Sequence, residues 1–161
     1  MPAVVRKLFE DYVKERFDLE DCIAVNNGTA ALIAPLWSLD LQPGDEVITT
    51  PFTFIATTNA IVIAGGTPVF VDIDPDTYLI DPNKIEQAVT ERTRVILPVH
   101  LYGRVCAMEK INVIAEKHSL SVIEDTAQAF GAEHASGKYA GMMSDAGTFS
   151  LETLKPLALA I

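Results

Sequence analysis

The chain has 161 residues, a formal net charge of −10 and a hydrophobic content of 49%. This much apolar sequence supports one folded domain and excludes intrinsic disorder, and the excess of acidic residues argues against nucleic acid or an anionic membrane as the main partner. No apolar run reaches the roughly 18–20 residues of a membrane-spanning helix. The first 17 residues mix acids and bases, unlike a signal peptide, so the composition predicts a soluble, cytoplasmic protein.

Stretches with helical periodicity alternate along the chain with short β-branched runs. We predict helices at residues 4–17, 29–39, 53–64, 82–89 and 108–118. We predict strands at residues 22–25, 46–49, 68–73, 94–99 and 120–124. This alternation predicts an α/β fold, a mostly parallel sheet with helices on both faces. After Asp125, glycines spread through short strand-like runs predict a hairpin, and no repeat or linker divides residues 1–161 into two domains.

Several common ligand-site signals are missing from the sequence. Cys22 and Cys106 are isolated from each other and from any His at ligand spacing, which predicts reduced thiols and no metal site. There is no G-x-G-x-x-G motif. The run from Gly131 to Lys138 has one residue too many between its glycines for a nucleoside-triphosphate loop, and Tyr139 follows where Ser or Thr is required.

Gly28 and Thr29 lie between a predicted strand and a predicted helix. Ligands of open parallel sheets bind beyond the carboxyl ends of the strands. Gly28 lets the backbone approach an anion, the first amides of the helix are unpaired, and Thr29 adds a hydroxyl. This stretch suits one phosphate group. The alternative is a plain helix cap.

Three further residues follow strand ends and suit a planar, nitrogen-containing ligand. Asp125 ends an apolar strand, where a buried carboxylate needs a cationic or donor partner, such as a protonated ring nitrogen. Gln128 lies three residues further on. Phe54 can offer a flat face to a ring. The alternatives are a helix N-cap for Asp125 and a core position for Phe54.

The remaining candidates are His100, Ser150 and Lys155. His100 is either a base or a satisfied, partly buried side chain between apolar neighbours. Lys155 is the only lysine in the apolar tail, and desolvation would give it a neutral amine for Schiff-base chemistry, the alternative being a solvated lysine. Ser150, five residues earlier, is an ordinary serine when considered alone.

Seven segments followed by Lys155 carry a family resemblance. They are Asn27-Gly-Thr-Ala-Ala-Leu32, Pro43-Gly-Asp-Glu-Val47, Pro51-Phe-Thr-Phe-Ile-Ala-Thr57, Pro68-Val-Phe-Val-Asp-Ile-Asp74, Pro98-Val-His-Leu-Tyr-Gly103, Val122-Ile-Glu-Asp-Thr-Ala-Gln-Ala129 and Ser144-Asp-Ala-Gly-Thr-Phe-Ser150. In joint order and spacing, the chain resembles the DegT/StrS family of pyridoxal-phosphate (PLP)-dependent sugar aminotransferases. The resemblance implies the large domain of the aspartate-aminotransferase-like fold, fold type I.

The resemblance also implies a role for each matching residue. Phosphate binding falls to four positions: Gly28, Thr29, Ala30 and Ser150. Phe54 matches the aromatic residue that stacks on the pyridine ring, and Gln128 the residue near its 3-oxygen. Asp125 matches the carboxylate that pairs with the ring nitrogen and makes the ring an electron sink. Lys155 matches the lysine that forms the Schiff base and then moves a proton as the catalytic base.

The implied reaction transfers an amino group from glutamate or glutamine to a nucleotide-linked keto-sugar, in a homodimer. Keto-sugar dehydratases of the same family carry His where this chain has Lys155, so transamination is preferred. Family members are more than twice as long and add a small C-terminal domain, so we expect residues 1–161 to be an incomplete large domain. Pro156 also departs from the family pattern. The alternative is a non-catalytic fragment that only binds PLP or an intact paralogue.

Overall fold

The structure is a computed structural model that describes residues 2–151 of the chain. Its helices are α1 (Ala3–Phe17), α2 (Gly28–Ser38), α3 (Ala56–Ile63), α4 (Pro82–Ala88) and α5 (Met108–His118). Its strands are β1 (Glu46–Thr49), β2 (Thr67–Phe70), β3 (Thr93–Ile96), β4 (Ser121–Asp125) and β5 (Ala146–Thr148). All five predicted helices are confirmed, with small differences at their ends. Asp81 caps α4 by accepting a hydrogen bond from the Asn83 amide, and Pro82 follows it at the first helical position.

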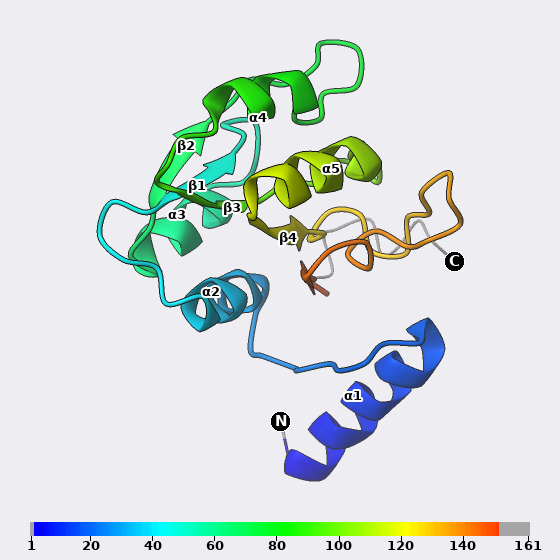
Figure 1. The fold of residues 1–161 in the computed structure, drawn as a ribbon. Coiled ribbons are helices and arrows are strands. Elements are labelled where there is room, and N and C mark those ends of the chain that lie inside the picture. Colours follow the sequence, from blue (N-terminus) through cyan, green and yellow to red (C-terminus); the bar gives the residue numbers. More distant parts are fainter. Residues whose placement is uncertain (1, 152–161) are drawn as a thin grey trace.

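The five strands form one parallel sheet in the order β2-β1-β3-β4-β5. The chain runs outward from β1 to β2, then returns past β1 to β3 and continues to β4. Because parallel crossovers are right-handed, these opposite directions place α3 on one face and α4 and α5 on the other. α2 packs beside α3, and Figure 1 shows the resulting three layers. The predicted α/β fold is therefore confirmed.

The predicted strands 68–73 and 94–99 form but end three residues earlier, at Phe70 and Ile96, and two other predicted elements are absent or reduced. Residues 22–25 form no strand: Ile23 and Val25 are exposed, and the Ala24 amide donates to a Glu10 carboxylate oxygen instead of a neighbouring strand. The predicted hairpin is reduced to a single antiparallel bridge between Glu133 and Tyr139. The chain then enters β5, a short parallel edge strand paired with β4. An apolar run is enough to predict a strand from sequence, but a strand forms only where a neighbouring strand can pair with it.

The hydrophobic core lies on both faces of the central strands. Every residue of β1 is buried, as are Val95 and Ile96 of β3, which is typical of a parallel strand covered by helices on both sides. None of the helices within residues 2–151 is long and apolar enough to cross a membrane.

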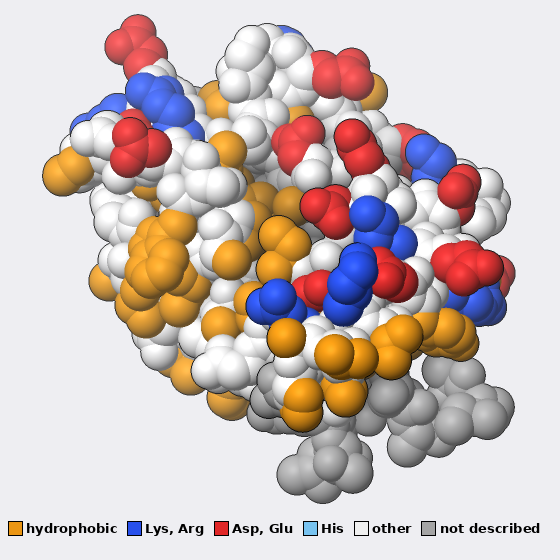
Figure 2. Space-filling view, turned by 90° about the horizontal axis from the view of Figure 1, so that it is seen from below, with side chains coloured by type: hydrophobic (Ala, Val, Ile, Leu, Met, Phe, Trp, Pro, Cys, Tyr) orange, Lys and Arg blue, Asp and Glu red, His pale blue; other side chains and the backbone are white. Residues whose placement is uncertain are grey.

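The first helix stands apart from the sheet. Figure 1 shows α1 apart from the sheet, and none of its residues is buried. Its apolar side chains lie exposed beside acidic and basic ones (Figure 2). Its last residue, Phe17, makes edge-to-face contacts with Phe130 and Tyr139, at centroid distances of 5.8 and 5.3 Å. Phe130 in turn contacts Phe149, close to the end of β5. These rings attach the end of α1 to the segment that leads into β5.

Candidate active site

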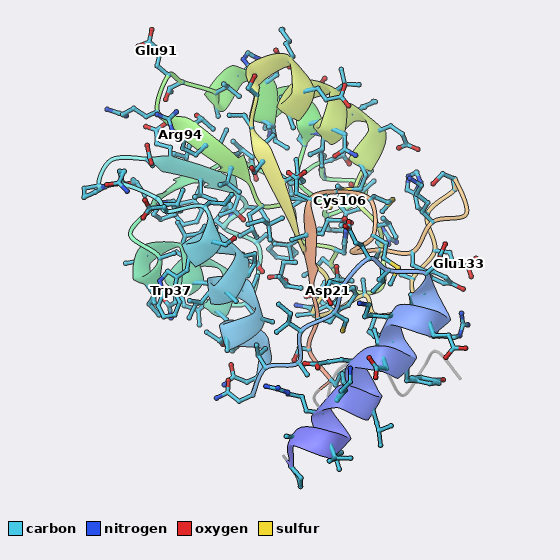
Figure 3. All side chains as sticks on the ribbon, turned by 60° about the horizontal axis from the view of Figure 1, so that its bottom comes forward. Asp21, Trp37, Glu91, Arg94, Cys106 and Glu133 are labelled. Atoms are coloured by element: carbon cyan, nitrogen blue, oxygen red, sulfur yellow. The ribbon has the colours of Figure 1, made fainter. Side chains whose placement is uncertain are left out.

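A cavity of about 460 Å³ opens at the carboxyl edge of the sheet. It is formed where β1 and β4 end and where α2 begins. Its lining includes Gly28, Thr29, Ala30, Phe54, Asp125, Gln128 and Ser150. The structure thus brings together the predicted site residues except His100, which does not line the cavity, and Lys155, which lies outside the described residues. Glu91 and Arg94 lie at the opposite edge of the sheet, where β3 begins (Figure 3).

The start of α2 combines a helix cap with free amides. The side chain of Asn27 accepts a hydrogen bond from the Ala30 amide at 2.8 Å, and its carbonyl accepts one from the Ala31 amide at 3.1 Å. The helix-cap alternative is therefore realised, with Asn27 as the cap, and the Ala30 amide is already engaged. Within residues 2–151, the amides of Gly28 and Thr29 donate to no other group, so these two remain for an anion.

Gly28 is required by the close approach of another segment. A Cβ atom at this position would lie 2.8 Å from the Cβ and 3.0 Å from the Oγ of Ser150. Ser150 itself is 5% exposed and lines the cavity. The absence of a side chain at residue 28 therefore lets the serine hydroxyl sit at the positive end of α2, next to the free amides.

Asp125 is a buried carboxylate whose position is fixed by the sheet. Its residue is 3% exposed. Its amide donates to the Pro98 carbonyl, and its carbonyl accepts from the His100 amide, both at 2.9 Å. Its Oδ2 accepts a hydrogen bond from the Thr57 hydroxyl at 2.8 Å, and its Oδ1 accepts one from the Ala127 amide at 3.1 Å. Asp125 caps no helix within residues 2–151, so that alternative is wrong.

Phe54 and Gln128 lie at the rim of the same cavity. Phe54 is 65% exposed and lines the cavity, so the alternative of a core phenylalanine is wrong, and an exposed aromatic ring can stack on a planar ligand. Gln128 is half-buried and lies three residues after Asp125. Its carbonyl accepts a hydrogen bond from the Gly103 amide at 3.0 Å, which ties this loop to the one after β3.

His100 is a fully buried and satisfied histidine. Its Nδ1 accepts a hydrogen bond from the Cys106 amide at 3.0 Å, so the ring proton lies on Nε2, which donates to Glu124 at 2.7 Å. His100 is not among the cavity residues. The thiol of Cys106 contacts the Val99 carbonyl, and burial, aided by the charge of Glu124, raises its pKa to about 12. This thiol is therefore inert.

Glu124 joins β4 to the loop before β5. Its carboxylate accepts hydrogen bonds at 2.8 Å from the Gly141 amide, the Met143 amide and the Ser144 hydroxyl, in addition to the one from His100. Burial alone would raise the pKa of Glu124, but the interactions with His100, the Met143 amide and the Ser144 hydroxyl outweigh it and hold the pKa below its ordinary value of 4.5. The ionised carboxylate thus fixes the path of the chain into β5 and towards Ser150.

We expect Glu124→Gln to lower the free energy of unfolding at pH 7 by about 3–5 kcal/mol, because an amide nitrogen would face buried donors. A pKa depressed in the folded state stabilises the protein above pH 4.5, and this stabilisation is lost as the pH falls through the folded-state pKa. The difference between wild type and variant should therefore shrink on acidification. Urea unfolding between pH 7 and 3 measures it, with the exposed Glu116→Gln as control. Equal stability at pH 7 would contradict the account.

Sequence reasoning missed the hydroxyl groups next to Asp125. Thr57, with Thr53 beside it, contacts the carboxylate. Thr53 and Thr57 are four residues apart, a spacing typical of one helix face, and this much can be recognised in the sequence. The contact of Thr57 with a carboxylate 68 residues away had no signal in a single sequence.

Comparisons with known proteins agree with this arrangement. The sequence model of the DegT/DnrJ/EryC1/StrS aminotransferase family matches residues 5–160. The chain is 52% identical to a pleiotropic regulatory protein of Geobacillus stearothermophilus, over 84% of this chain and 36% of that protein. It is 46% identical to the GDP-perosamine synthase of Caulobacter vibrioides, over 89% of this chain and 38% of that protein. The chain thus spans little more than a third of the length of these curated relatives.

A solved structure supports the same family. NtdA of Bacillus subtilis, solved with bound PMP, is 44% identical and superposes with a TM-score of 0.77, over 84% of this chain and 31% of that chain. PMP is the aminated form of PLP, so this structure and the family indicate PLP as the cofactor. The family match, the parallel sheet and the cavity at its carboxyl edge lead to one conclusion: the chain belongs to the DegT/DnrJ/EryC1/StrS aminotransferase family.

Proposed function

We propose that this chain supplies the PLP-binding part of an aminotransferase that moves an amino group from glutamate or glutamine to a nucleotide-linked keto-sugar. The observation that carries the proposal is one cavity that holds both a buried carboxylate, Asp125, and the free amides at the start of α2. The names of relatives support the substrate class. They include a GDP-perosamine synthase and a dTDP-3-amino-3,6-dideoxy-alpha-D-galactopyranose transaminase.

The residues present fit the two ends of PLP. The amides of Gly28 and Thr29 and the hydroxyl of Ser150 suit a phosphate dianion, because the α2 dipole adds positive potential there. The buried carboxylate of Asp125, when ionised, would suit a protonated ring nitrogen and would keep that nitrogen charged.

The other lining residues fit the ring between those ends. Phe54 would cover one ring face, and Gln128 would bind the ring oxygen. When bound, PLP supplies an electron sink for the negative charge that develops on the substrate carbon.

Lys155 completes the proposed machinery. It follows Ser150 by five residues and would hold the cofactor covalently, then carry a proton between substrate and cofactor carbons as a general base. We further propose that the whole enzyme is a homodimer and acts in the cytoplasm, as is usual for enzymes that use nucleotide-linked sugars.

The proposal is tested by a chimera in which these 161 residues replace the corresponding segment of the GDP-perosamine synthase. We expect the chimera to bind PLP and to convert L-glutamate to 2-oxoglutarate in the presence of that enzyme's keto-sugar. The same chimera with Lys155→Ala should be inactive, and the parent enzyme is the positive control. A folded chimera that binds PLP but forms no 2-oxoglutarate would contradict the proposed reaction.

A further inference from the structure

Thr57 joins α3 to the carboxylate at the end of β4. It lies in the first turn of α3, is 1% exposed, and its hydroxyl donates to Asp125 Oδ2 at 2.8 Å. Its amide donates to the Phe54 carbonyl at 3.2 Å, which fixes the backbone of this turn beside the cavity. The position of this hydroxyl is therefore set by the helix and by the loop that carries Phe54.

The direction of the hydrogen bonds around Thr57 follows from proton counting. The Thr53 hydroxyl lies 2.9 Å from the Thr57 hydroxyl. An ionised carboxylate only accepts, and a hydroxyl has one proton to donate. Thr57 therefore donates to Asp125, and Thr53 donates to Thr57. The two threonines form a short relay that ends on Oδ2 of Asp125, with every donor directed towards the carboxylate.

The backbone of Asp125 is held by β-sheet hydrogen bonds, so only its side-chain torsions remain to be set. Thr57 holds Oδ2, and the Ala127 amide holds Oδ1 at 3.1 Å. Together they fix the plane of the carboxylate.

We propose that Thr57 is a positioning residue for Asp125, which fixes the carboxylate so that it meets a protonated ring nitrogen in the cavity. This inference rests on the proposed function, because it requires PLP as the ligand. Its specific consequence is selectivity. Loss of the Thr57 hydroxyl should weaken the binding of a ligand that has the ring nitrogen and should spare a ligand that lacks it.

The test uses the purified 161-residue chain and two ligands, PLP and the analogue in which CH replaces the ring nitrogen. Dissociation constants come from absorbance titrations. We expect Thr57→Val to weaken PLP binding by about tenfold or more, the effect of losing a hydrogen bond to a charged group. Binding of the CH analogue should change by less than about twofold, since it offers Asp125 no cation. Thr57→Ser, which keeps the hydroxyl, should restore PLP binding.

Thr49→Val is the matched control. The Thr49 hydroxyl is also buried, but it donates to the Leu97 carbonyl at 2.8 Å and not to Asp125. This variant should bind both ligands like wild type. If circular dichroism shows that Thr57→Val does not fold, Thr53→Val replaces it, with a smaller but equally selective loss expected.

Three results would overturn the inference. An equal loss of affinity for both ligands would mean that Thr57 acts through packing alone. Unchanged PLP binding in a folded Thr57→Val chain would mean that Asp125 needs no positioning by this hydroxyl. Failure of the wild-type chain to bind PLP would overturn the proposed function and this inference with it. This failure can be told apart from the other two, because it is measured on the wild-type chain before any variant is made.

Discussion

Replacing Asp125 by alanine is expected to weaken PLP binding to this chain by about 100-fold or more, the largest single effect of any substitution within residues 2–151. The reason is electrostatic. Truncating one partner of a buried, hydrogen-bonded charge pair costs about 2–5 kcal/mol, and Asp125 is 3% exposed at the cavity. An absorbance titration of the purified variant with PLP measures the loss.

Two companion variants show that the effect belongs to the charge. Asp125→Asn keeps the shape and an acceptor for the Thr57 hydroxyl, yet it should also bind PLP poorly because a neutral amide does not stabilise a ring cation. Asp145→Asn is the control, since the Asp145 carboxylate accepts from the Val122 amide, at the opposite end of β4 from Asp125. PLP binding by Asp125→Ala at wild-type strength would show that the cavity does not use this carboxylate.

Adding one methyl group at residue 28 is expected to damage the phosphate end of the site. In Gly28→Ala the new Cβ would lie 2.8 Å from the Cβ of Ser150, so either the start of α2 or the serine must move. Overpacking of this kind destabilises by about 1–3 kcal/mol. The affinity for PLP should fall by about tenfold or more, because the free amides and the hydroxyl lose their common geometry. Pyridoxal, which has no phosphate, should bind with nearly unchanged affinity.

A second substitution separates the clash from the loss of ligand binding. Ser150→Gly in the Gly28→Ala background removes the atoms that the new methyl group meets. Thermal unfolding should then return towards the wild-type temperature, whereas PLP binding should stay weak because the serine hydroxyl is gone. If Gly28→Ala alone binds PLP and pyridoxal with the wild-type ratio of affinities, the start of α2 is not the phosphate site.

The parallel sheet and the place of the site could be predicted from the sequence because each depends on local pattern. Residues 46–49, with Val47 and Ile48 at their centre, predict a short strand, and the structure gives β1 the same bounds. Asp125 ends β4 and Gln128 follows it, and the topology of a parallel sheet brings such positions to one edge. Gly28 reaches the same cavity as the first residue of α2, although the strand predicted before it does not form.

The features that could not be predicted depend on contacts between segments that are distant in the sequence. The run 22–25 is as apolar as a strand, but no sheet edge lies beside it, and Ile23 remains 76% exposed. β5 is only three residues long and contains a glycine, so it has no alternating pattern to find. Glu124 reads as the polar end of a strand, and only the fold brings the loop from Gly141 to Ser144 onto its carboxylate.

We propose that Lys155 holds PLP covalently at this cavity. The most direct measurement is to incubate the purified chain with PLP, reduce it with borohydride and map the modified peptide by mass spectrometry. We predict stoichiometric phosphopyridoxyl modification at Lys155 and only trace labelling at the six other lysines, with Lys155→Ala abolishing the stoichiometric label. Labelling spread evenly over the surface lysines, or an undiminished label in Lys155→Ala, would contradict the account.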